Sequence, residues 1–316
     1  MSLSNNINTE QLHEKCPRLF RGRDLHDKKR QVDIKTLTPV LVSIVFWSSA
    51  FAGIRSALLN YSPGHLALLR FLMASGVLVV YAVCNHLPVP SLRDIPQILF
   101  LGFLGIAVYH TALNYGETSV TAGSASLLIA STPALTALFA VIFLKEKMSR
   151  WGWVGIATSF FGVFLVTLGE GNGLQFDFGA ILILVAALSS SAYFVFQKPL
   201  LEKYGALPMT TYIICAGTFF MLIFLPGLPQ AIFSAPLYST FSVAYLGVFP
   251  GALAYVTWTQ ALSKAPASLV SSFLYLSPVL AIFIAWVLLN EIPSLISLVG
   301  GVISIVGVMM VNFFYK

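Results

Sequence analysis

Charged residues are scarce in this chain, and they are unevenly distributed. Only 9 % of the 316 residues are Asp, Glu, Lys or Arg, whereas 57 % are hydrophobic. Of the 30 charged residues, 13 precede Val40, so the rest of the chain has only 17. Soluble globular domains carry about 25 % charged residues. The composition therefore excludes an ordinary soluble protein and predicts an integral membrane protein.

Several motifs are also missing. The three cysteines, Cys16, Cys84 and Cys215, have no CxxC spacing, so the sequence predicts neither a disulfide framework nor a metal site. The sequence has no GxxxxGK[ST] phosphate loop, so the chain is not an ATP-driven pump by itself. It also has no HExxH zinc motif, so nothing indicates zinc chemistry. We expect no cofactor and no enzymatic activity.

The first 35 residues are polar and lack the apolar segment of a secretory signal, so we expect residues 1–35 to form a cytoplasmic tail that is not cleaved. The net charge of +6 does not indicate nucleic-acid binding, because membrane proteins collect Lys and Arg on their cytoplasmic side. The expected partners are a small-molecule substrate and the lipid bilayer. The sequence leaves a monomer and a homodimer open.

Ten stretches are long and apolar enough to cross a membrane, which takes about 20 residues in a helix. They lie near residues 36–58, 63–84, 94–116, 119–144, 151–168, 178–200, 207–226, 237–262, 267–289 and 294–315. Short segments rich in Pro, Gly, Ser or Asn separate most of them, so no soluble domain fits between them.

The second five stretches repeat the first five. A shift of 145 residues needs no gap and matches Pro133 with Pro278, Glu146 with Glu291, Gly155 with Gly300 and Gly162 with Gly307. Five crossings per copy give consecutive copies opposite orientations, as in many secondary transporters. The sequence thus predicts an all-α integral membrane protein of ten transmembrane helices, arranged as two inverted five-helix repeats over residues 36–169 and 178–316.

The positive charges predict the direction of the crossings. With the N-terminus inside, 16 of the 18 Lys and Arg residues fall on the cytoplasmic side, and the outer segments near 117–119, 169–177, 227–236 and 290–293 have none. The remaining two, Arg55 and Arg70, lie within helices. The positive-inside rule places both termini in the cytoplasm. We expect the protein in a bacterial-type cytoplasmic membrane.

Short motifs add a resemblance to a known family. They are Trp-Ser-Ser-Ala-Phe at 47–51, Arg-Phe at 70–71, and in each copy a Pro followed by Glu thirteen residues later. With the two five-helix copies, the chain from about residue 36 to its end resembles the EamA family of the drug/metabolite transporter superfamily. The resemblance implies an exporter or exchanger of amino acids or other small metabolites, with helices one, three, four, six, eight and nine around a central cavity.

Helical spacing locates candidate residues for that cavity. His110, Asn114 and Glu117 fall on one face of the third helix, and the 145-residue shift matches the first two with Tyr255 and Thr259 of the eighth. The first and sixth helices also carry polar and aromatic candidate residues at matched positions on one face each. Ser124, Ser126, Ser131, Ser268, Ser271 and Ser272 add small hydroxyls. The candidate substrate-binding residues are Trp47, Ser48, Phe51, Arg55, His110, Asn114, Tyr193, Gln197, Tyr255, Trp258, Thr259 and Tyr275.

Each candidate also has a structural interpretation. Tyr and Trp gather at membrane interfaces, and Ser or Thr can bond to neighbouring helices. Arg55 can bind a carboxylate or extend to the membrane surface, and Arg70 can bind an anion or cap carbonyls. His110 can take a proton or remain neutral and hydrogen-bonded to a neighbouring helix. No Asp or Glu is expected in mid-membrane, which favours facilitated exchange over a strongly proton-driven pump.

Pro133 and Pro278 each remove a backbone hydrogen bond within an expected helix. These prolines can act as hinges or as fixed bends. The preferred hypothesis is a secondary transporter, most simply an amino-acid exporter or exchanger that works by alternating access. The first alternative is a carrier of another metabolite or of a drug-like compound, in either direction. A membrane-embedded enzyme and a channel rank below it.

Overall fold

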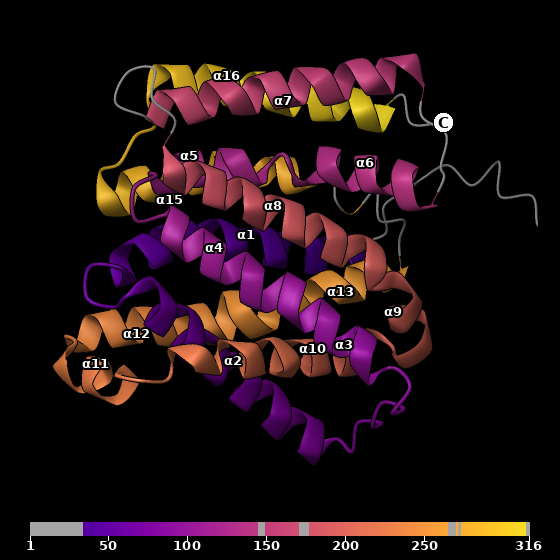
Figure 1. Ribbon diagram of the computed structural model, residues 1–316, viewed down its shortest axis with the longest axis vertical. Helices are drawn as coiled ribbons and strands as arrows, with labels where there is room; N and C mark the ends of the chain where they lie inside the picture. The colour runs from indigo at the N-terminus through magenta and orange to yellow at the C-terminus, as the bar shows by residue number, and fades with distance from the viewer. Residues whose placement is uncertain (1–33, 145–148, 171–176, 265–269, 271–272, 314–316) are drawn as a thin grey trace, which may run out of the picture. The chain divides into compact units, whose positions relative to one another are not determined.

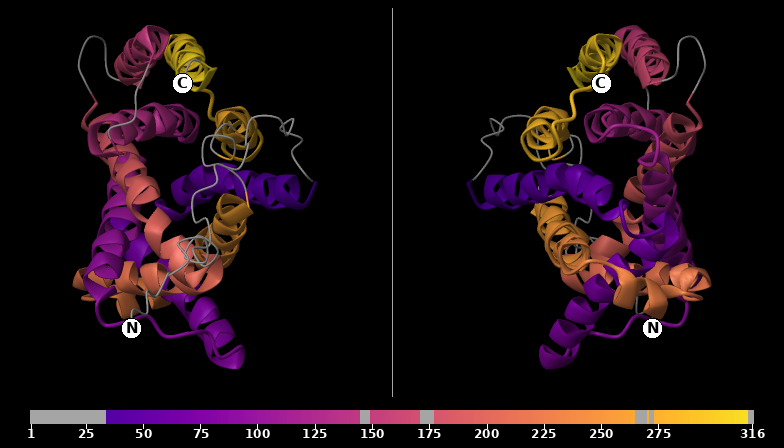
Figure 2. Two further views of the ribbon diagram at one scale, coloured as in Figure 1. Left: turned by 90° about the vertical axis from the view of Figure 1, so that its right-hand side faces the viewer. Right: turned by 90° about the vertical axis from the view of Figure 1, so that its left-hand side faces the viewer.

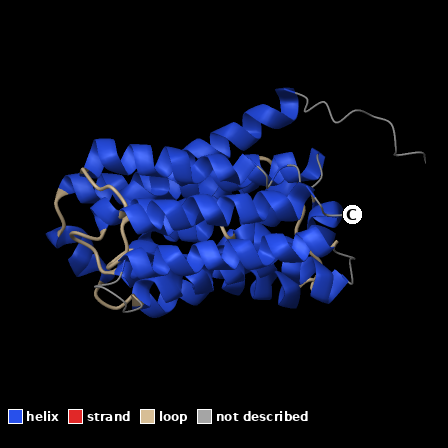
Figure 3. Ribbon diagram, turned by 90° about the horizontal axis from the view of Figure 1, so that it is seen from above, coloured by secondary structure: helices blue, strands red, loops and turns tan. Residues whose placement is uncertain are grey.

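Every regular element that the structure describes is a helix. The computed structural model describes residues 34–144, 149–170, 177–264, 270 and 273–313, and within these ranges Figure 3 shows helices and loops only. The described helices belong to one compact unit, Ile34–Lys316. Of the predicted tail, residues 1–33 lie outside the described part, and Ile34 already begins the first helix.

The elements follow one another as a run of long helices, several of which are joined end to end (Figure 1). The first sequence copy contains α1 Ile34–Ala57, α2 Pro63–Cys84, α3 Ile95–Gly102, η1 Phe103–Val108, α4 Tyr109–Gly116, α5 Ala122–Ile129, α6 Thr132–Leu144 and α7 Arg150–Glu170. The second contains α8 Phe178–Phe196, α9 Lys198–Tyr204, α10 Ala206–Met221, η2 Leu222–Phe224, α11 Leu228–Ser234, α12 Leu237–Leu246, η3 Gly247–Leu253, α13 Ala254–Lys264, η4 Phe273–Tyr275, α15 Leu276–Leu289 and α16 Leu295–Phe313.

A helix lies in each of the ten apolar stretches predicted from the sequence. Within the described ranges, seven helical spans are long and apolar enough to cross a membrane: Leu37–Ala57, Pro63–Cys84, Ile95–Gly116, Ala122–Phe143, Phe178–Phe196, Ala206–Phe224 and Leu237–Ser263. Three shorter apolar stretches, Arg150–Val166, Leu276–Leu289 and Leu295–Met310, fall in the remaining predicted crossings. The chain is therefore an all-helical protein with several candidate membrane spans.

Polar residues just before the helices mark where several of them begin. The Ser62 hydroxyl accepts a hydrogen bond from the backbone N–H of His65, and Pro63 at the first position of α2 has no N–H that would need an acceptor. The Asp177 carboxylate accepts from Ala180 N at 3.1 Å at the start of α8. Such caps satisfy backbone N–H groups that have no partner inside the helix, so these loops fix where the apolar spans start.

The third and eighth predicted helices each contain a π-helical segment in the middle. In the first copy this is η1, between α3 and α4, and in the second it is η3, between α12 and α13. The 145-residue shift carries Phe103–Val108 onto residues 248–253, inside η3. Pro250 lies in η3 and has no N–H, so it cannot continue the α-helical bonding there. Such π-helical bulges are frequent at functional sites.

Small residues let α7 and α16 lie side by side, as Figures 1 and 2 show. A Cβ added at Gly162 would come within 2.3 Å of Ser304 N, and one at Gly307 within 2.3 Å of Ser159 N. The hydroxyls of Ser159 and Ser304 are 3.2 Å apart. The small-residue face predicted from the sequence is therefore used for packing within the chain.

Helix α1 lies in the interior of the helical unit. It packs against α5, α12, α13 and α15, so it contacts elements of both sequence copies. Ile44 and Ile54 are fully buried on it, as is the polar Ser43. The Ser43 hydroxyl donates to the carbonyl of Ala254 at 3.0 Å and thereby joins α1 to α13.

The two prolines do not lie in mid-helix as the sequence predicted. Pro133 is the second residue of α6, and Pro278 is the third residue of α15. The fourth predicted helix is interrupted at Ala130 and Ser131, between α5 and α6. A proline fits the first turn of a helix because the N–H groups there have no intrahelical acceptor. The prolines start second half-helices, and whether they act as hinges stays a prediction.

Candidate functional site

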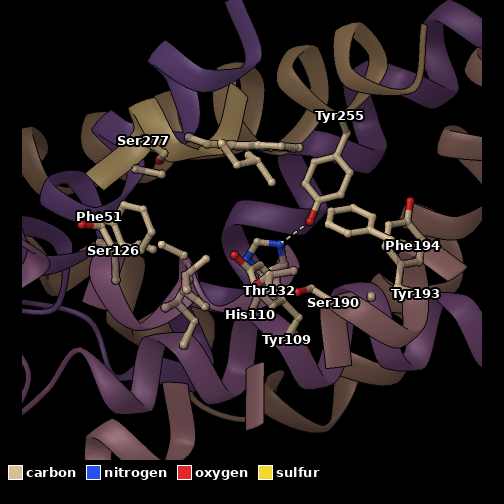
Figure 4. Close-up of a pocket in the computed structure, with 18 of the residues that line it drawn as sticks. Phe51, Tyr109, His110, Ser126, Thr132, Ser190, Tyr193, Phe194, Tyr255 and Ser277 are labelled. Carbon is tan, nitrogen blue, oxygen red and sulfur yellow. Dashed lines mark hydrogen bonds between the residues drawn. The ribbon is translucent and has the colours of Figure 1, made fainter. Parts of the chain in front are cut away.

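A cavity lies among the helices and is bordered by both sequence copies (Figure 4). About 790 Å³ of its region is free of atoms, a volume that includes space continuous with solvent. Six aromatic side chains border it: Trp47, Phe51, Tyr109, Tyr193, Phe194 and Tyr255. Six polar ones do as well: Arg70, His110, Ser126, Thr132, Ser190 and Ser277. An apolar cavity with a few convergent polar groups is the usual form of a small-molecule site.

The walls come from the six helices that the family resemblance implied, and from one more. Helices α1, α4 with η1, α5 and α6, α8, α13, and α15 with η4 supply all the lining residues except Ala130, which lies between α5 and α6, and Arg70, which comes from α2. Gly105 of η1 has a local role, because a Cβ there would lie 2.5 Å from the Tyr193 ring. The absence of a side chain at Gly105 therefore lets Tyr193 reach the wall.

His110 and Tyr255 meet inside this cavity. The two residues are 145 positions apart, and His110 Nε2 lies 2.9 Å from the Tyr255 hydroxyl, as the dashed line in Figure 4 shows. The His110 ring also packs against Phe71 and Tyr109, with ring centroids 4.4 and 4.5 Å away. The hydrogen bond to a neighbouring helix that the neutral interpretation of His110 requires is therefore present.

Five of the twelve predicted site residues border the cavity. They are Trp47, Phe51, His110, Tyr193 and Tyr255. The Trp47 ring lies 5.4 Å from that of Tyr255, and its indole N–H donates to the Pro250 carbonyl at 3.2 Å. Figure 4 shows Phe51 near Ser126 and Ser277, away from Tyr193 and Phe194. Tyr109 and Tyr255 are labelled between these two groups, so aromatic rings occur along the cavity.

Other predicted residues are buried but do not border the cavity. The Ser48 hydroxyl is 3.0 Å from that of Ser277, so it lies one contact behind the wall. Asn114 donates to the carbonyl of Pro63 at 3.2 Å, and Thr259 lies 2.9 Å from the Thr210 hydroxyl. These contacts join neighbouring helices, as the structural interpretation of such residues requires.

Trp258, Gln197 and Tyr275 complete the predicted set. Trp258 does not border the cavity but packs on Trp47, with ring centroids 5.0 Å apart. Gln197 is buried between α8 and α9, and neither atom of its side-chain amide has a hydrogen-bond partner in the described part of the chain. The side chain of Tyr275 lies outside the described residues, as do Glu146, Ser268, Ser271 and Ser272.

Arg55 forms an ion pair away from the cavity lining. Its Nε is 3.0 Å from the Oε1 of Glu291, and its Nη1 donates to the carbonyls of Glu117 at 2.6 Å and Thr118 at 3.0 Å. The other Glu291 oxygen accepts from Ala122 N at the start of α5, at 3.2 Å. One cluster therefore ties together the ends of α1, α4, α5 and α15.

Two ionisable residues that were not among the predicted site residues prove to be buried. Arg70 borders the cavity, and only 1 % of its surface is exposed. Glu117 is fully buried, and neither of its carboxylate oxygens has a partner in the described residues. Glu117 lies at the end of α4, as the sequence predicted, but neighbouring helices cover that end and bury the carboxylate. Among described residues, no group of three or more His, Cys, Asp or Glu could hold a metal ion.

Comparison with known proteins agrees with this architecture. The family model described as "EamA-like transporter family" matches the chain twice, over residues 35–168 and 177–313. The chain belongs to the EamA-like transporter family. Members of this family and the relatives described below are named as transporters, so the chain is a transporter and not an enzyme.

Three curated relatives span most of the chain. It is 42 % identical to "Uncharacterized transporter YdfC" of Bacillus subtilis over 281 residues, which are 89 % of this chain and 91 % of that one. It is 36 % identical to "Probable terminal-alkyne amino-acid exporter" of Streptantibioticus cattleyicolor, over 88 % and 93 % of the two chains. It is 26 % identical to "Uncharacterized inner membrane transporter YedA" of Escherichia coli, over 85 % and 87 %.

A solved crystal structure matches at the level of the fold. The TM-score is 0.61 over 89 % of this chain and 97 % of the other, at 18 % sequence identity. With the apolar helices and the inner-membrane relative, these comparisons identify a multi-pass protein of the cell membrane.

Proposed function

We propose that this protein is a secondary transporter that exports or exchanges amino acids by alternating access through the central cavity. The observation that carries the proposal is the cavity itself, which both sequence copies border with aromatic rings and scattered hydroxyls. A carrier must replace water around a small amphipathic molecule near the middle of the membrane. Aromatic walls can cover its apolar part, and hydroxyls can bond to its polar groups.

The same proposal includes ten crossings in two inverted repeats, over residues 36–169 and 178–316, with both termini in the cytoplasm. Three features support it: the 145-residue match in the sequence, the π-helical segments at matched positions, and the contacts between matched residues His110 with Tyr255 and Ser159 with Ser304. Contacts between equivalent residues are expected where an axis of internal symmetry passes between them.

The ion pair of Arg55 and Glu291 fits one state of such a cycle. It joins elements from both copies at the end of α1 that the positive charges place outside. With that end tied, the cavity faces away from the outside, and opening there requires Arg55 to leave Glu291 and two carbonyls. In this proposal Pro133 and Pro278 start the half-helices α6 and α15 that move relative to their neighbours.

Amino acids are the favoured cargo because one relative is named as a probable exporter of a terminal-alkyne amino acid at 36 % identity. Carriage of another small metabolite or of a drug-like compound is the second candidate. The apolar character of the cavity walls favours that candidate as well.

Counterflow in proteoliposomes tests the proposal. Vesicles with purified protein are preloaded with a mixture of the standard amino acids, and the accumulation of each labelled one is followed without ATP or a proton gradient. We expect saturable accumulation of a few amino acids. Linear, non-saturating flux would indicate a channel. If the protein is correctly inserted but no amino acid accumulates, amino-acid exchange is excluded and other metabolites become the candidates.

A matched pair of variants tests the cavity. Tyr255→Ala removes a ring that borders it, whereas Trp286→Ala removes an aromatic ring from α15 that is 52 % exposed on the outer surface. We expect Tyr255→Ala to lower counterflow at least tenfold, because it loses both packing and the His110 contact, and Trp286→Ala to keep it. Equal rates in both variants would count against this cavity as the transport site.

A further inference from the structure

Arg70 brings an unbalanced charge to the wall of the cavity. It lies on α2, borders the cavity, and exposes only 1 % of its surface. Its Nη1 has no hydrogen-bond partner among the described residues. The ion pairs found in the described part of the chain involve Arg55 and Lys203, and neither includes Arg70.

The Nε atom of the guanidinium is held by a backbone carbonyl next to a proline. Arg70 Nε donates to the carbonyl of Leu246 at 3.2 Å. In an α-helix that carbonyl would accept from the residue four positions later, which is Pro250 and has no N–H. The Leu246 carbonyl, at the start of the π-helical segment η3, therefore lacks an α-helical donor and accepts from Arg70 Nε. Gly247 allows the approach, because a Cβ there would lie 2.6 Å from the Arg70 carbonyl oxygen.

A buried cation that keeps an unused donor is costly in a membrane protein unless something anionic or polar joins it. An arginine fixed through Nε still presents terminal N–H groups, and a carboxylate is the anion that matches their fork. The other walls are mainly aromatic, with Tyr109 and Tyr255 among the rings. The cavity thus combines one anion-binding point with a large apolar surface.

We infer that Arg70 is the anchor for the substrate's carboxylate, so the cargo is an amphipathic carboxylate whose apolar or aromatic body packs against Trp47, Tyr193, Phe194 and Tyr255. This inference rests on the proposed transport function and names its substrate class. It assigns the anionic contact to Arg70 and not to Arg55, which the Glu291 carboxylate and two carbonyls already occupy.

The competing explanation is that Arg70 is a structural residue balanced by Glu117. Glu117 is fully buried and electrostatically coupled to Arg70, but its two oxygens make no hydrogen bond within the described residues. A purely structural Arg70 would affect the binding of all ligands alike. A carboxylate anchor would affect only ligands that carry a carboxylate, and this difference makes the inference testable.

The experiment measures ligand-dependent thermal stabilisation of the purified full-length protein in detergent with four probes. L-Phenylalanine and 3-phenylpropionate carry a carboxylate, whereas L-phenylalaninamide and phenethylamine have the same ring without one. We expect the wild type to bind the first two at least about tenfold more tightly. Arg70→Met should abolish that preference. Arg70→Lys, which keeps the charge but loses the planar fork, should weaken both carboxylates and still prefer them.

Arg55→Gln is the matched control, and we expect it to retain the preference for carboxylates. Equal binding of all four probes by the wild type, no binding of any probe, or an unchanged preference in Arg70→Met would each overturn the inference. If Arg70→Met does not fold, undiminished carboxylate binding by Arg70→Lys would overturn it instead. Because binding is measured without transport, a carboxylate preference with no counterflow would leave the anchor standing and remove the proposed exchange.

Discussion

The two sequence copies share backbone features but differ in buried charge. Each copy has a π-helical segment at the same position, a helix that begins near a matched proline, and a small-residue face on its last helix. At the same 145-residue shift, however, Arg70 corresponds to Cys215, and Glu117 to Leu262. Arg55 corresponds to Gln197 at a shift of 142. The charged members of these pairs all belong to the first copy.

This difference suggests a division of roles. The backbone of a repeat sets where helices bend and how closely they pack, and both copies need the same geometry to surround one cavity. A single substrate has one polar end, so it needs a charged partner on one side only. Each copy supplies three of the aromatic rings, but Arg70 and His110 both come from the first, and the polar groups of the second are hydroxyls only. On this view the substrate lies with its polar end towards the first copy.

The strongest test of the shared backbone is a matched pair of glycines. Gly162→Ala and Gly307→Ala each place a Cβ 2.3 Å from a backbone nitrogen of the partner helix. We expect each to lower the free energy of unfolding by about 3 kcal/mol, because the close contact of α7 and α16 must open. The free energy is measured by denaturant titration in detergent.

Gly76→Ala is the control, since a Cβ at Gly76 meets nothing within 4 Å. It should be neutral or slightly stabilising, as for Gly to Ala within an exposed helix position. If Gly162→Ala proves harmless while Gly307→Ala is damaging, the two copies do not contribute equally to this contact.

The second test breaks the contact between the matched residues His110 and Tyr255. Tyr255→Phe leaves His110 without a partner for Nε2, and its Nδ1 already has none in the described residues. We expect a loss of about 2 kcal/mol in the free energy of unfolding, the usual cost of an unpaired buried polar group. Combining Tyr255→Phe with His110→Phe should cost less than the sum of the single variants, and strict additivity would show that the hydrogen bond contributes nothing.

The third test compares Arg55 with its counterpart Gln197. Arg55→Gln removes the pair with Glu291, whose side chains are 28 % and 22 % exposed, so solvent limits the loss to about 1 kcal/mol. Gln197→Met removes a buried amide that has no partner among the described residues and should stabilise the protein by about 1 kcal/mol. Thermal unfolding at low and high salt checks both, since only the Arg55 effect should shrink with salt. If both substitutions lower the stability by a similar amount, the two copies do not differ at this matched position.

Hydrophobicity and spacing were enough to predict the helices, because a membrane span is a local property of about 20 residues. The stretch 63–84 matches α2, and 94–116 differs from Ile95–Gly116 by one residue. The aromatic part of the site was also predictable, since Trp47, Tyr193 and Tyr255 lie on inward faces. The carboxyl end of the third helix was not, because its sequence does not show that other helices cover Glu117.

The position of Arg70 could not be predicted either. Its contact with Leu246 spans 176 residues of sequence and is made to a carbonyl that has no α-helical donor, because Pro250 has no N–H. The spacing rule also placed Asn114 and Thr259 on the cavity face, yet they bond to Pro63 and Thr210. Periodicity identifies the buried face of a helix, but the choice between a neighbouring helix and the cavity depends on crossing angles that the sequence pattern does not carry.

The smallest effect is expected at the surface pair that joins the first copy to the second. Lys203 of α9 donates to the carboxylate of Asp94 just before α3, and the Tyr204 hydroxyl does so too.

Hydrogen bonds from Lys203 and Tyr204 lower the pKa of Asp94, and the bond to Asp94 raises the pKa of Lys203. The contribution of Asp94 to stability is therefore present above its unfolded pKa of about 3.9 and is lost as pH falls through the lower folded value. That of Lys203 is present below its unfolded pKa of about 10.4 and is lost as pH rises through the higher folded value. Asp94→Asn should therefore lower the stability slightly at neutral pH, where this contribution is present, and leave it unchanged at a pH below the folded pKa of Asp94, where the contribution is already lost. Equal stability of Asp94→Asn and the wild type at every pH would show that this surface contact between the copies contributes nothing.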